Sequence, residues 1–172
     1  MKIGVPKEIK PQEHRIGLTP ESVKTLISEG HEVLVENNGG FEAGFDNEQY
    51  TSIGAKIIDK VEDIFNDADI IVKVKEPQSS EVKMIRENQV VYTYLHLAAA
   101  KELTEGLIKS KGVCIAYETV TDDNRRLPLL APMSAVAGRM SVQAGAHCLE
   151  KNQKGRGLLL GGAPGVEGGT VV

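Results

Sequence analysis

Ile-Ile-Val-Lys-Val-Lys-Glu-Pro, residues 70–77, is a β-branched apolar run that becomes charged and stops at a proline. A buried strand of a parallel sheet has this pattern. Pro77 cannot continue a central strand, because it lacks a main-chain N–H. We therefore predict a strand over 69–75 with Lys75 at its carboxyl end. Ligands of open α/β sheets bind beyond such ends, which makes Lys75 a candidate site residue. The alternative is a solvated lysine where a strand leaves the core.

Short apolar runs recur on both sides of this stretch, and helical patterns separate them. The predicted strands are 2–5, 32–36, 56–58, 69–75, 90–95 and 113–117, with helices between them at 20–29, 47–53, 61–66, 81–88 and 101–111. Strands and helices that alternate at such short intervals predict an α/β fold. We expect an open parallel sheet with helices on both faces, Rossmann-like or flavodoxin-like, followed by a long connecting helix.

The rhythm breaks over 119–132, which is polar and then rich in proline. The longest helical pattern, 132–151, follows and carries many small residues. It is either a helix packed in a core or a connecting helix at a domain or subunit junction, and we favour the junction. Strands are expected at 158–160 and from 170 onward. We therefore assign 1–130 to one α/β domain and 131–172 to a connecting helix and the start of a second domain.

The segment Gly162-Ala163-Pro164-Gly165-Val166-Glu167-Gly168-Gly169 is rich in glycine, but it is not a dinucleotide-binding fingerprint. Its spacing is wrong, a proline interrupts it, and it precedes a predicted strand, whereas the fingerprint follows one. A glycine-rich turn is the simpler interpretation. A true fingerprint is expected only after a strand that begins at residue 170.

Composition excludes little but points to an ordinary globular protein. The 172 residues are 41% hydrophobic and 26% charged, and the net charge of −4 argues against a nucleic-acid or membrane surface. Two cysteines, Cys114 and Cys148, form no disulfide or metal pattern and are expected to be core thiols. No metal site is predicted. The absence of a signal sequence or a membrane-spanning run indicates a cytoplasmic protein.

Four chemically capable residues follow predicted strands: Arg15, Lys75, His96 and Glu118. In a parallel sheet they gather at one edge. An arginine matches a carboxylate with two hydrogen bonds, and a lysine polarises a carbonyl or holds a carboxylate. A histidine transfers a proton near neutral pH. The set suits a small oxo- or amino acid, although a single histidine at a strand end is more often structural.

Several motifs in collinear order resemble one family over the whole chain. They are Gly4-Val5-Pro6-Lys7-Glu8, Glu13-His14-Arg15-Ile16, Thr19-Pro20, Lys73-Val74-Lys75-Glu76-Pro77, Tyr94-Leu95-His96-Leu97-Ala98, Ala116-Tyr117-Glu118-Thr119-Val120, Leu129-Leu130-Ala131-Pro132-Met133-Ser134 and Val136-Ala137-Gly138-Arg139. The chain resembles the amino-terminal part of the alanine dehydrogenase family, which includes the transhydrogenase alpha subunit. His96 in its Leu-His-Leu-Ala run favours the alanine dehydrogenase branch.

The resemblance implies roles for particular residues. Arg15 and Lys75 would hold the carboxylate and carbonyl region of the substrate, and His96 would be the catalytic acid/base. Met133 would contact substrate and Ser134 the cofactor at the junction. The implied reaction is the reversible conversion of L-alanine, NAD and water to pyruvate, ammonia and NADH. The implied full-length protein is a homo-oligomer that binds NAD mainly outside this chain.

The sequence departs from the family at three positions and lacks a large part of it. Gln12 stands in place of Asn, Gly17 in place of Ala, and Ala135 in place of Glu. The family's NAD domain is absent, so we interpret the chain as a fragment or a truncated product that is inactive alone. A non-catalytic small-molecule-binding or assembly module is the second possibility. A transhydrogenase or saccharopine-type dehydrogenase is the third.

Overall fold

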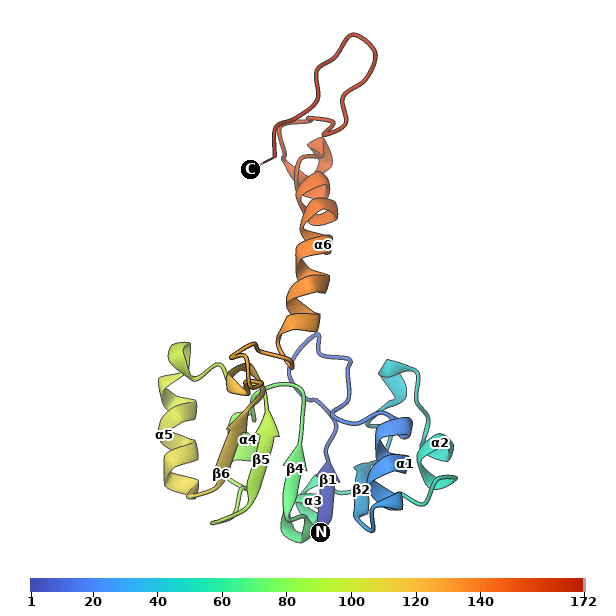
Figure 1. Ribbon diagram of the computed structural model, residues 1–172, viewed down its shortest axis with the longest axis vertical. Coiled ribbons are helices and arrows are strands. Elements are labelled where there is room, and N and C mark those ends of the chain that lie inside the picture. The colour runs from blue at the N-terminus through green and yellow to red at the C-terminus, as the bar shows by residue number, and fades with distance from the viewer. Residues whose placement is uncertain (172) are drawn as a thin grey trace. The chain divides into compact units, whose positions relative to one another are not determined.

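The computed structural model describes residues 1–171 and divides the chain into two compact units, Met1–Val120 and Thr121–Val172. The first unit holds a sheet of six parallel strands in the order β3-β2-β1-β4-β5-β6 (Figure 1). The strands are β1 (Lys2–Val5), β2 (Glu32–Glu36), β3 (Lys56–Ile58), β4 (Ile70–Val72), β5 (Val90–Thr93) and β6 (Val113–Ala116). This is the Rossmann strand order, and it confirms the predicted fold class. The order reverses between β1 and β4, which makes their carboxyl ends the topological switch point.

Helices cover both faces of this sheet. They are α1 (Pro20–Ser28), α2 (Asn47–Thr51), α3 (Val61–Asp67), α4 (Ser79–Val82) and α5 (Lys101–Ser110), with short 3-10 turns η1 (Phe41–Ala43), η2 (Leu97–Ala99) and η3 (Tyr117–Thr119). Side chains alternate along a strand, so Val33 and Val35 pack with α1 and α2, whereas Leu34 packs with α3 on the other face. Right-handed crossovers explain the split: α1 and α2 connect strands that are added from β1 toward β3, whereas α3 leads to β4, from which strands are added toward the other edge.

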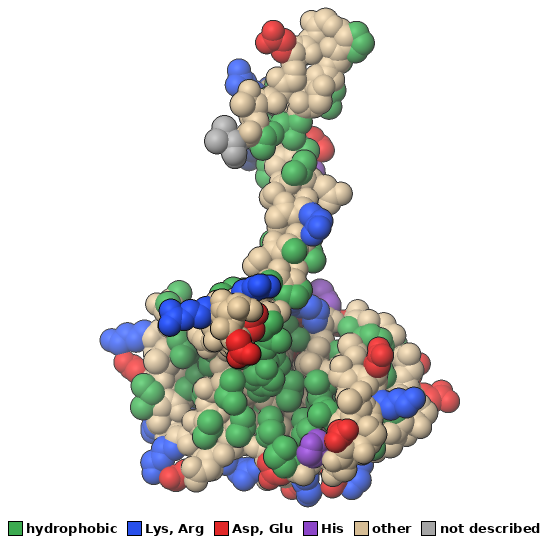
Figure 2. Space-filling view, in the orientation of Figure 1, with side chains coloured by type: hydrophobic (Ala, Val, Ile, Leu, Met, Phe, Trp, Pro, Cys, Tyr) green, Lys and Arg blue, Asp and Glu red, His purple; other side chains and the backbone are tan. Residues whose placement is uncertain are grey.

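One part of the sheet has no helix over it. Val113 and Ile115 on β6 are 48% and 42% exposed on the α1 side, whereas Cys114 between them packs into the opposite core. Figure 2 shows hydrophobic side chains gathered over the middle of this unit. The apolar face of the sheet is therefore wider than the helices that cover it.

The regular strands are shorter than predicted at their carboxyl ends. β4 stops at Val72 and β5 at Thr93, but two main-chain hydrogen bonds continue the pairing. The N–H of Lys73 donates to the Tyr92 carbonyl at 3.1 Å, and the N–H of Tyr94 to the Val74 carbonyl at 3.2 Å. The segments that carry the candidate site residues are thus fastened to each other just beyond the regular sheet.

The helix predicted at 81–88 is wrong in its bounds. α4 begins earlier because Gln78 and Glu81 form a capping box, in which each side chain accepts from the other's main-chain N–H. It ends at Val82, and the following segment adopts turns that include Asn88 at a positive φ of 65°. The remaining helices agree with the predicted ranges to within a few residues at each end.

The second unit contains α6 (Ala131–Cys148) and the short turn η4 (Lys151–Gln153). None of the α6 residues is buried in the described chain. Cys148 is exposed, so the expectation of a core thiol there is wrong. The strand expected at 158–160 is absent, because this unit has no neighbouring strand for it to pair with in the described residues. Residues 170–171 are not a strand either, and Val172 lies outside the described residues. Among residues 1–171, no helix has the length and apolar character needed to cross a membrane.

Candidate functional site

The carboxyl edge of the sheet carries the predicted site residues of the first unit. Arg15 lies in the loop after β1, Lys75 follows β4, His96 follows β5, and Glu118 follows β6 within η3. These four strands are consecutive in the sheet, and all run in the same direction. Arg15 and Lys75 flank the switch point, where ligands of Rossmann-type sheets bind.

Gly17 brings the loop with Arg15 close to the end of β4. A Cβ at position 17 would lie 2.5 Å from the main-chain oxygen of Val72, nearer than real contacts allow. Only glycine therefore fits without a shift of the loop. Gly17 is one of the departures from the family pattern, and the structure gives it a packing consequence.

The guanidinium of Arg15 is held by a carboxylate of its own loop. Its Nε donates to Glu13 Oε1 and its Nη2 to Glu13 Oε2, both at 2.7 Å, and the Arg15 main-chain N–H donates to Oε1 at 3.0 Å. These bonds lower the pKa of Glu13 to about 2, although burial alone would raise it. The positive charge of Lys75 also lowers this pKa. The Arg15 side chain remains 47% exposed. Glu13 therefore orients Arg15, and its negative charge interacts with both Arg15 and Lys75. The sequence analysis did not predict this role for Glu13.

Lys75 is fixed through its main chain. Its N–H donates to Glu8 Oε1 at 3.3 Å, and its carbonyl accepts from the Thr93 hydroxyl at 2.9 Å. The same Glu8 oxygen accepts from the Val74 N–H at 2.6 Å. The segment that carries Lys75 is thereby held between β1 and β5, while its side chain is only partly buried.

The neighbouring lysine, Lys73, is buried and paired. Its side chain is 1% exposed, with Nζ 3.2 Å from Glu8 Oε2 and 2.7 Å from Glu81 Oε1. Burial raises the pKa of Glu81 despite the lysine charge, and it also raises the pKa of nearby Glu36. Lys73 thus belongs to the support of the site. Nothing in the local alternation of lysines distinguishes its role from that of Lys75.

His96 is exposed and has a left-handed backbone, with φ 51° and ψ 38°. Its ring stacks on Tyr94, with centroids 6.4 Å apart and planes at 24°. Tyr94 in turn packs edge-on against Tyr117, with ring centroids 4.9 Å apart. Burial raises the pKa of Tyr94, and the nearby charge of Arg15 partly opposes this. Tyr94 therefore contacts His96 and is near enough to Arg15 to be affected by its charge, so we include it in the candidate site.

Glu118 faces the main chain next to His96. Its Oε1 accepts the His96 N–H at 2.7 Å and the Leu95 N–H at 3.0 Å, and its Oε2 lies 3.2 Å from the Leu95 nitrogen. Burial alone would raise the pKa of Glu118, but these N–H groups outweigh it and lower the pKa. The fourth residue of the predicted set therefore binds protein groups.

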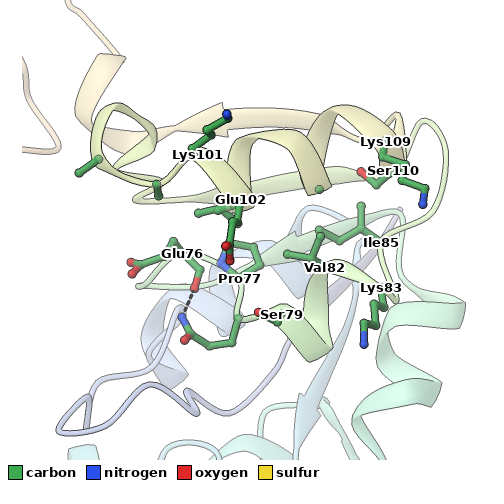
Figure 3. A pocket seen from close by; sticks show the side chains of 15 residues that line it. Glu76, Pro77, Ser79, Val82, Lys83, Ile85, Lys101, Glu102, Lys109 and Ser110 are labelled. Carbon is green, nitrogen blue, oxygen red and sulfur yellow. Dashed lines mark hydrogen bonds between the residues drawn. The ribbon is translucent and has the colours of Figure 1, made fainter.

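One cavity of the first unit lies elsewhere. It measures about 800 Å³ and is formed by the segment 76–85 together with α5, as Figure 3 shows. At its edge the Gln78 side-chain amide donates to the Glu76 carbonyl at 2.8 Å. Its lining contains none of Arg15, Lys75 or His96. The candidate residues therefore lie at the charged carboxyl edge of the sheet and do not line this cavity.

Met133 and Ser134 lie near the start of α6, in the second unit. Met133 is half-buried and Ser134 is exposed. Their predicted contacts with substrate and cofactor stay predictions, as does the assignment of 1–130 and 131–172 to two functional domains. No group of three His, Cys, Asp or Glu side chains in residues 1–171 is arranged to hold a metal ion.

The glycine-rich segment does not fit a dinucleotide. Ala163 and Val166 exchange two main-chain hydrogen bonds, at 3.0 and 2.8 Å, which close a tight turn. A diphosphate site needs main-chain N–H groups that point outward at a helix N-terminus. This turn uses the N–H groups of Ala163 and Val166 internally.

A six-stranded parallel sheet of Rossmann order, with an arginine, a lysine and a histidine beyond neighbouring strands, places the first unit in the Rossmann class of α/β domains. The chain belongs to the family described as alanine dehydrogenase/PNT, N-terminal domain, whose model matches residues 4–137. Alanine dehydrogenase from Halomonas elongata is 53% identical over 96% of this chain and 45% of its own length.

Two solved structures agree with this assignment. One is an L-alanine dehydrogenase with a TM-score of 0.87 and 53% identity, matched over 98% of this chain and 46% of its own. The other is a transhydrogenase from Sinorhizobium meliloti with a TM-score of 0.68 and 27% identity, over 73% and 37%. The chain therefore spans less than half the length of the alanine dehydrogenases that it matches.

Proposed function

We propose that this chain is the substrate-binding part of an NAD-dependent alanine dehydrogenase. The full-length protein would interconvert L-alanine, NAD and water with pyruvate, ammonia and NADH. The observation that carries the proposal is the arrangement of Arg15 and Lys75 at the switch point with His96 beyond the next strand. The alanine dehydrogenase relatives support it. We further propose a cytoplasmic homo-oligomer that acts on alanine and pyruvate and binds neither nucleic acid nor membrane.

Each residue has a role that suits its chemistry. The Arg15 guanidinium, oriented by Glu13, binds the substrate carboxylate. Lys75 donates to the substrate oxygen and stabilises the negative charge that develops there. His96 transfers a proton to or from the reacting oxygen or nitrogen. NAD would supply the hydride-accepting chemistry of the reaction when it is bound. Its main binding site lies outside the residues described, with Ser134 as the proposed contact from this chain.

A transhydrogenase-type or non-catalytic binding function is the alternative. The structural match to the Sinorhizobium meliloti transhydrogenase favours it only at the level of the family. His96 discriminates between the two, because a proton carrier at the substrate edge has a task in deamination and none in simple binding. The isolated 172-residue chain is expected to show no reduction of pyruvate by NADH under either function.

The experiment uses a chimera in which this chain replaces the matching segment of the Staphylococcus epidermidis alanine dehydrogenase, 51% identical over 171 residues. Ammonia-dependent oxidation of NADH by pyruvate measures its activity. His96→Ala should lower the rate about 10²–10⁴-fold, and Lys75→Ala should cost roughly 2–5 kcal/mol of transition-state binding. Lys101→Ala, at a side chain 88% exposed on α5, is the matched control and should change nothing.

Titration with NADH separates catalysis from structure. Binding of NADH should survive both site changes, because the cofactor site lies outside the residues described. Loss of NADH binding in parallel with turnover would mean that these residues organise structure instead. Full activity of both variants, or a folded chimera that binds NADH without any turnover, would refute the proposed function.

A further inference from the structure

We infer that Glu118 is a positioning residue for His96, acting through the main chain. The inference rests on the proposed role of His96 and adds to it the group that holds the histidine in place. Three observations carry it: the backbone conformation of His96, the acceptor geometry of Glu118, and the relation of their two strands.

His96 adopts the left-handed region at φ 51° and ψ 38°. For residues with a Cβ this region is uncommon, although histidine enters it more often than most. The conformation marks a sharp turn of the chain at His96, and the contacts around it decide how firmly the turn is held. The chain turns sharply here: the side chain of Leu95 is 2% exposed, whereas the side chain of His96 is exposed at the surface.

Glu118 supplies the external restraint. The turn leaves the N–H groups of Leu95 and His96 pointing to the same side, where no strand continues the ladder. Glu118 Oε1 accepts both, at 3.0 and 2.7 Å. A carboxylate that accepts main-chain N–H groups makes shorter and stronger bonds than a neutral acceptor. These bonds hold the peptide groups on both sides of Leu95, and they therefore fix the point at which the His96 side chain leaves the main chain.

The sheet explains why residue 118 reaches residue 96. β5 and β6 pair in parallel, with Thr93 opposite Ala116. Leu95 and Glu118 each follow two residues later, so they lie at neighbouring positions on the same edge of the sheet. Tyr117 packs edge-on against Tyr94, which carries the stacked ring of His96. The turn η3 therefore fixes the histidine twice, through its backbone and through its aromatic neighbour.

The test compares three substitutions in the active chimera. Glu118→Gln keeps an oxygen at the same reach, whereas Glu118→Asp keeps the charge but is roughly 1.5 Å shorter. If position is what matters, Gln should hold kcat within about threefold, and both Asp and Ala should lower it about 10- to 100-fold, as expected for a misplaced catalytic group. The KM for pyruvate should change little, because Arg15 and Lys75 bind the substrate. Glu105→Ala on α5 is the control for loss of an exposed glutamate of the same unit.

A second readout uses the 172-residue chain itself. Amide hydrogen exchange measured by NMR should show the Leu95 and His96 amides losing protection about tenfold or more in Glu118→Ala, and retaining it in Glu118→Gln. Activity in the order Asp above Gln would overturn the inference in favour of a charge effect on the histidine. Normal kcat in Glu118→Ala, while His96→Ala is impaired, would overturn it and leave the proposed function intact. Normal activity of His96→Ala itself would instead refute the proposed function.

Discussion

Replacement of Lys73 by methionine should destabilise the first unit far more than the loss of an ordinary lysine. Met fills a similar volume but leaves the Glu8 and Glu81 carboxylates without their cation. All three side chains are at most 2% exposed, so water cannot take the place of the ammonium group. Removal of one partner from a buried ion pair typically costs about 3–5 kcal/mol.

The structure places the expected cost near the lower end of that range. Glu8 keeps its bonds from the Val74 and Lys75 N–H groups, and Glu81 keeps the Gln78 N–H at 2.7 Å. One oxygen of each carboxylate, Glu8 Oε2 and Glu81 Oε1, then loses its contact with the ammonium group, while the other oxygen keeps its main-chain donors. We therefore expect about 3 kcal/mol, a large part of the roughly 5–15 kcal/mol that stabilises a domain.

Urea unfolding of the 172-residue chain at pH 7 measures this loss. Lys56→Met is the matched control, because Lys56 Nζ lies 2.7 Å from Glu32 Oε1 in a pair that is exposed on both sides. Exposed pairs contribute about 0–1 kcal/mol. The double change Lys73→Met with Glu81→Gln should recover part of the loss, since it removes one of the two orphaned charges.

The pH dependence checks the cause. Burial already raises the folded-state pKa of Glu81, and removal of Lys73 should raise it further. A raised folded pKa contributes stability that is present below the unfolded value near 4.5 and lost as pH rises through the folded value. The deficit of the variant should therefore be largest at pH 7 and smaller at pH 5. Equal losses for Lys73→Met and Lys56→Met, or a deficit that grows on acidification, would refute this reasoning.

Three further predictions concern the same chain. The pKa of Glu13 is about 2, below its unfolded value, so its contribution to stability should be lost as pH falls from 4.5 toward 2. Glu13→Gln should therefore reduce the slope of the free energy of unfolding against pH in this range by up to one proton. An unchanged slope would contradict the pair of hydrogen bonds from Arg15 to Glu13. On the covered face of the sheet, Val91→Thr should cost about 1–3 kcal/mol in urea unfolding because it buries a hydroxyl, whereas Ile115→Thr on the uncovered face should cost less than about 1 kcal/mol; equal costs would mean that both faces are buried in solution. Tyr50→Phe removes a buried donor to the Leu18 carbonyl at 2.9 Å and should lower thermal stability by about 1 kcal/mol or slightly more, and an unchanged melting temperature would show that the bond contributes nothing.

Local sequence determined the strands and helices of the first unit. β1, β2 and β3 have the predicted bounds, because apolar alternation and flanking turn residues act over a few positions. Pro77 and the charged residues before it were sufficient to place Lys75 beyond a strand end. Thr19 and Pro20 start α1 by the ordinary rules of helix capping, and the Thr19 side chain accepts the Ser22 N–H. The edge of the sheet that carries the candidate residues followed from parallel strands alone.

Tertiary structure decided which of these residues face the solvent and which support them. Lys73 and Lys75 are two positions apart in a strand-like segment, yet only Lys73 is buried, in contact with Glu81 and with Glu8, which is 65 residues away. His96 has a left-handed backbone, and its main-chain N–H donates to Glu118, 22 residues away in the sequence. Strand order and such long-range acceptors depend on how the elements pair across the sheet. No local pattern of residues encodes that pairing, so only the folded chain shows which carboxylate holds which backbone.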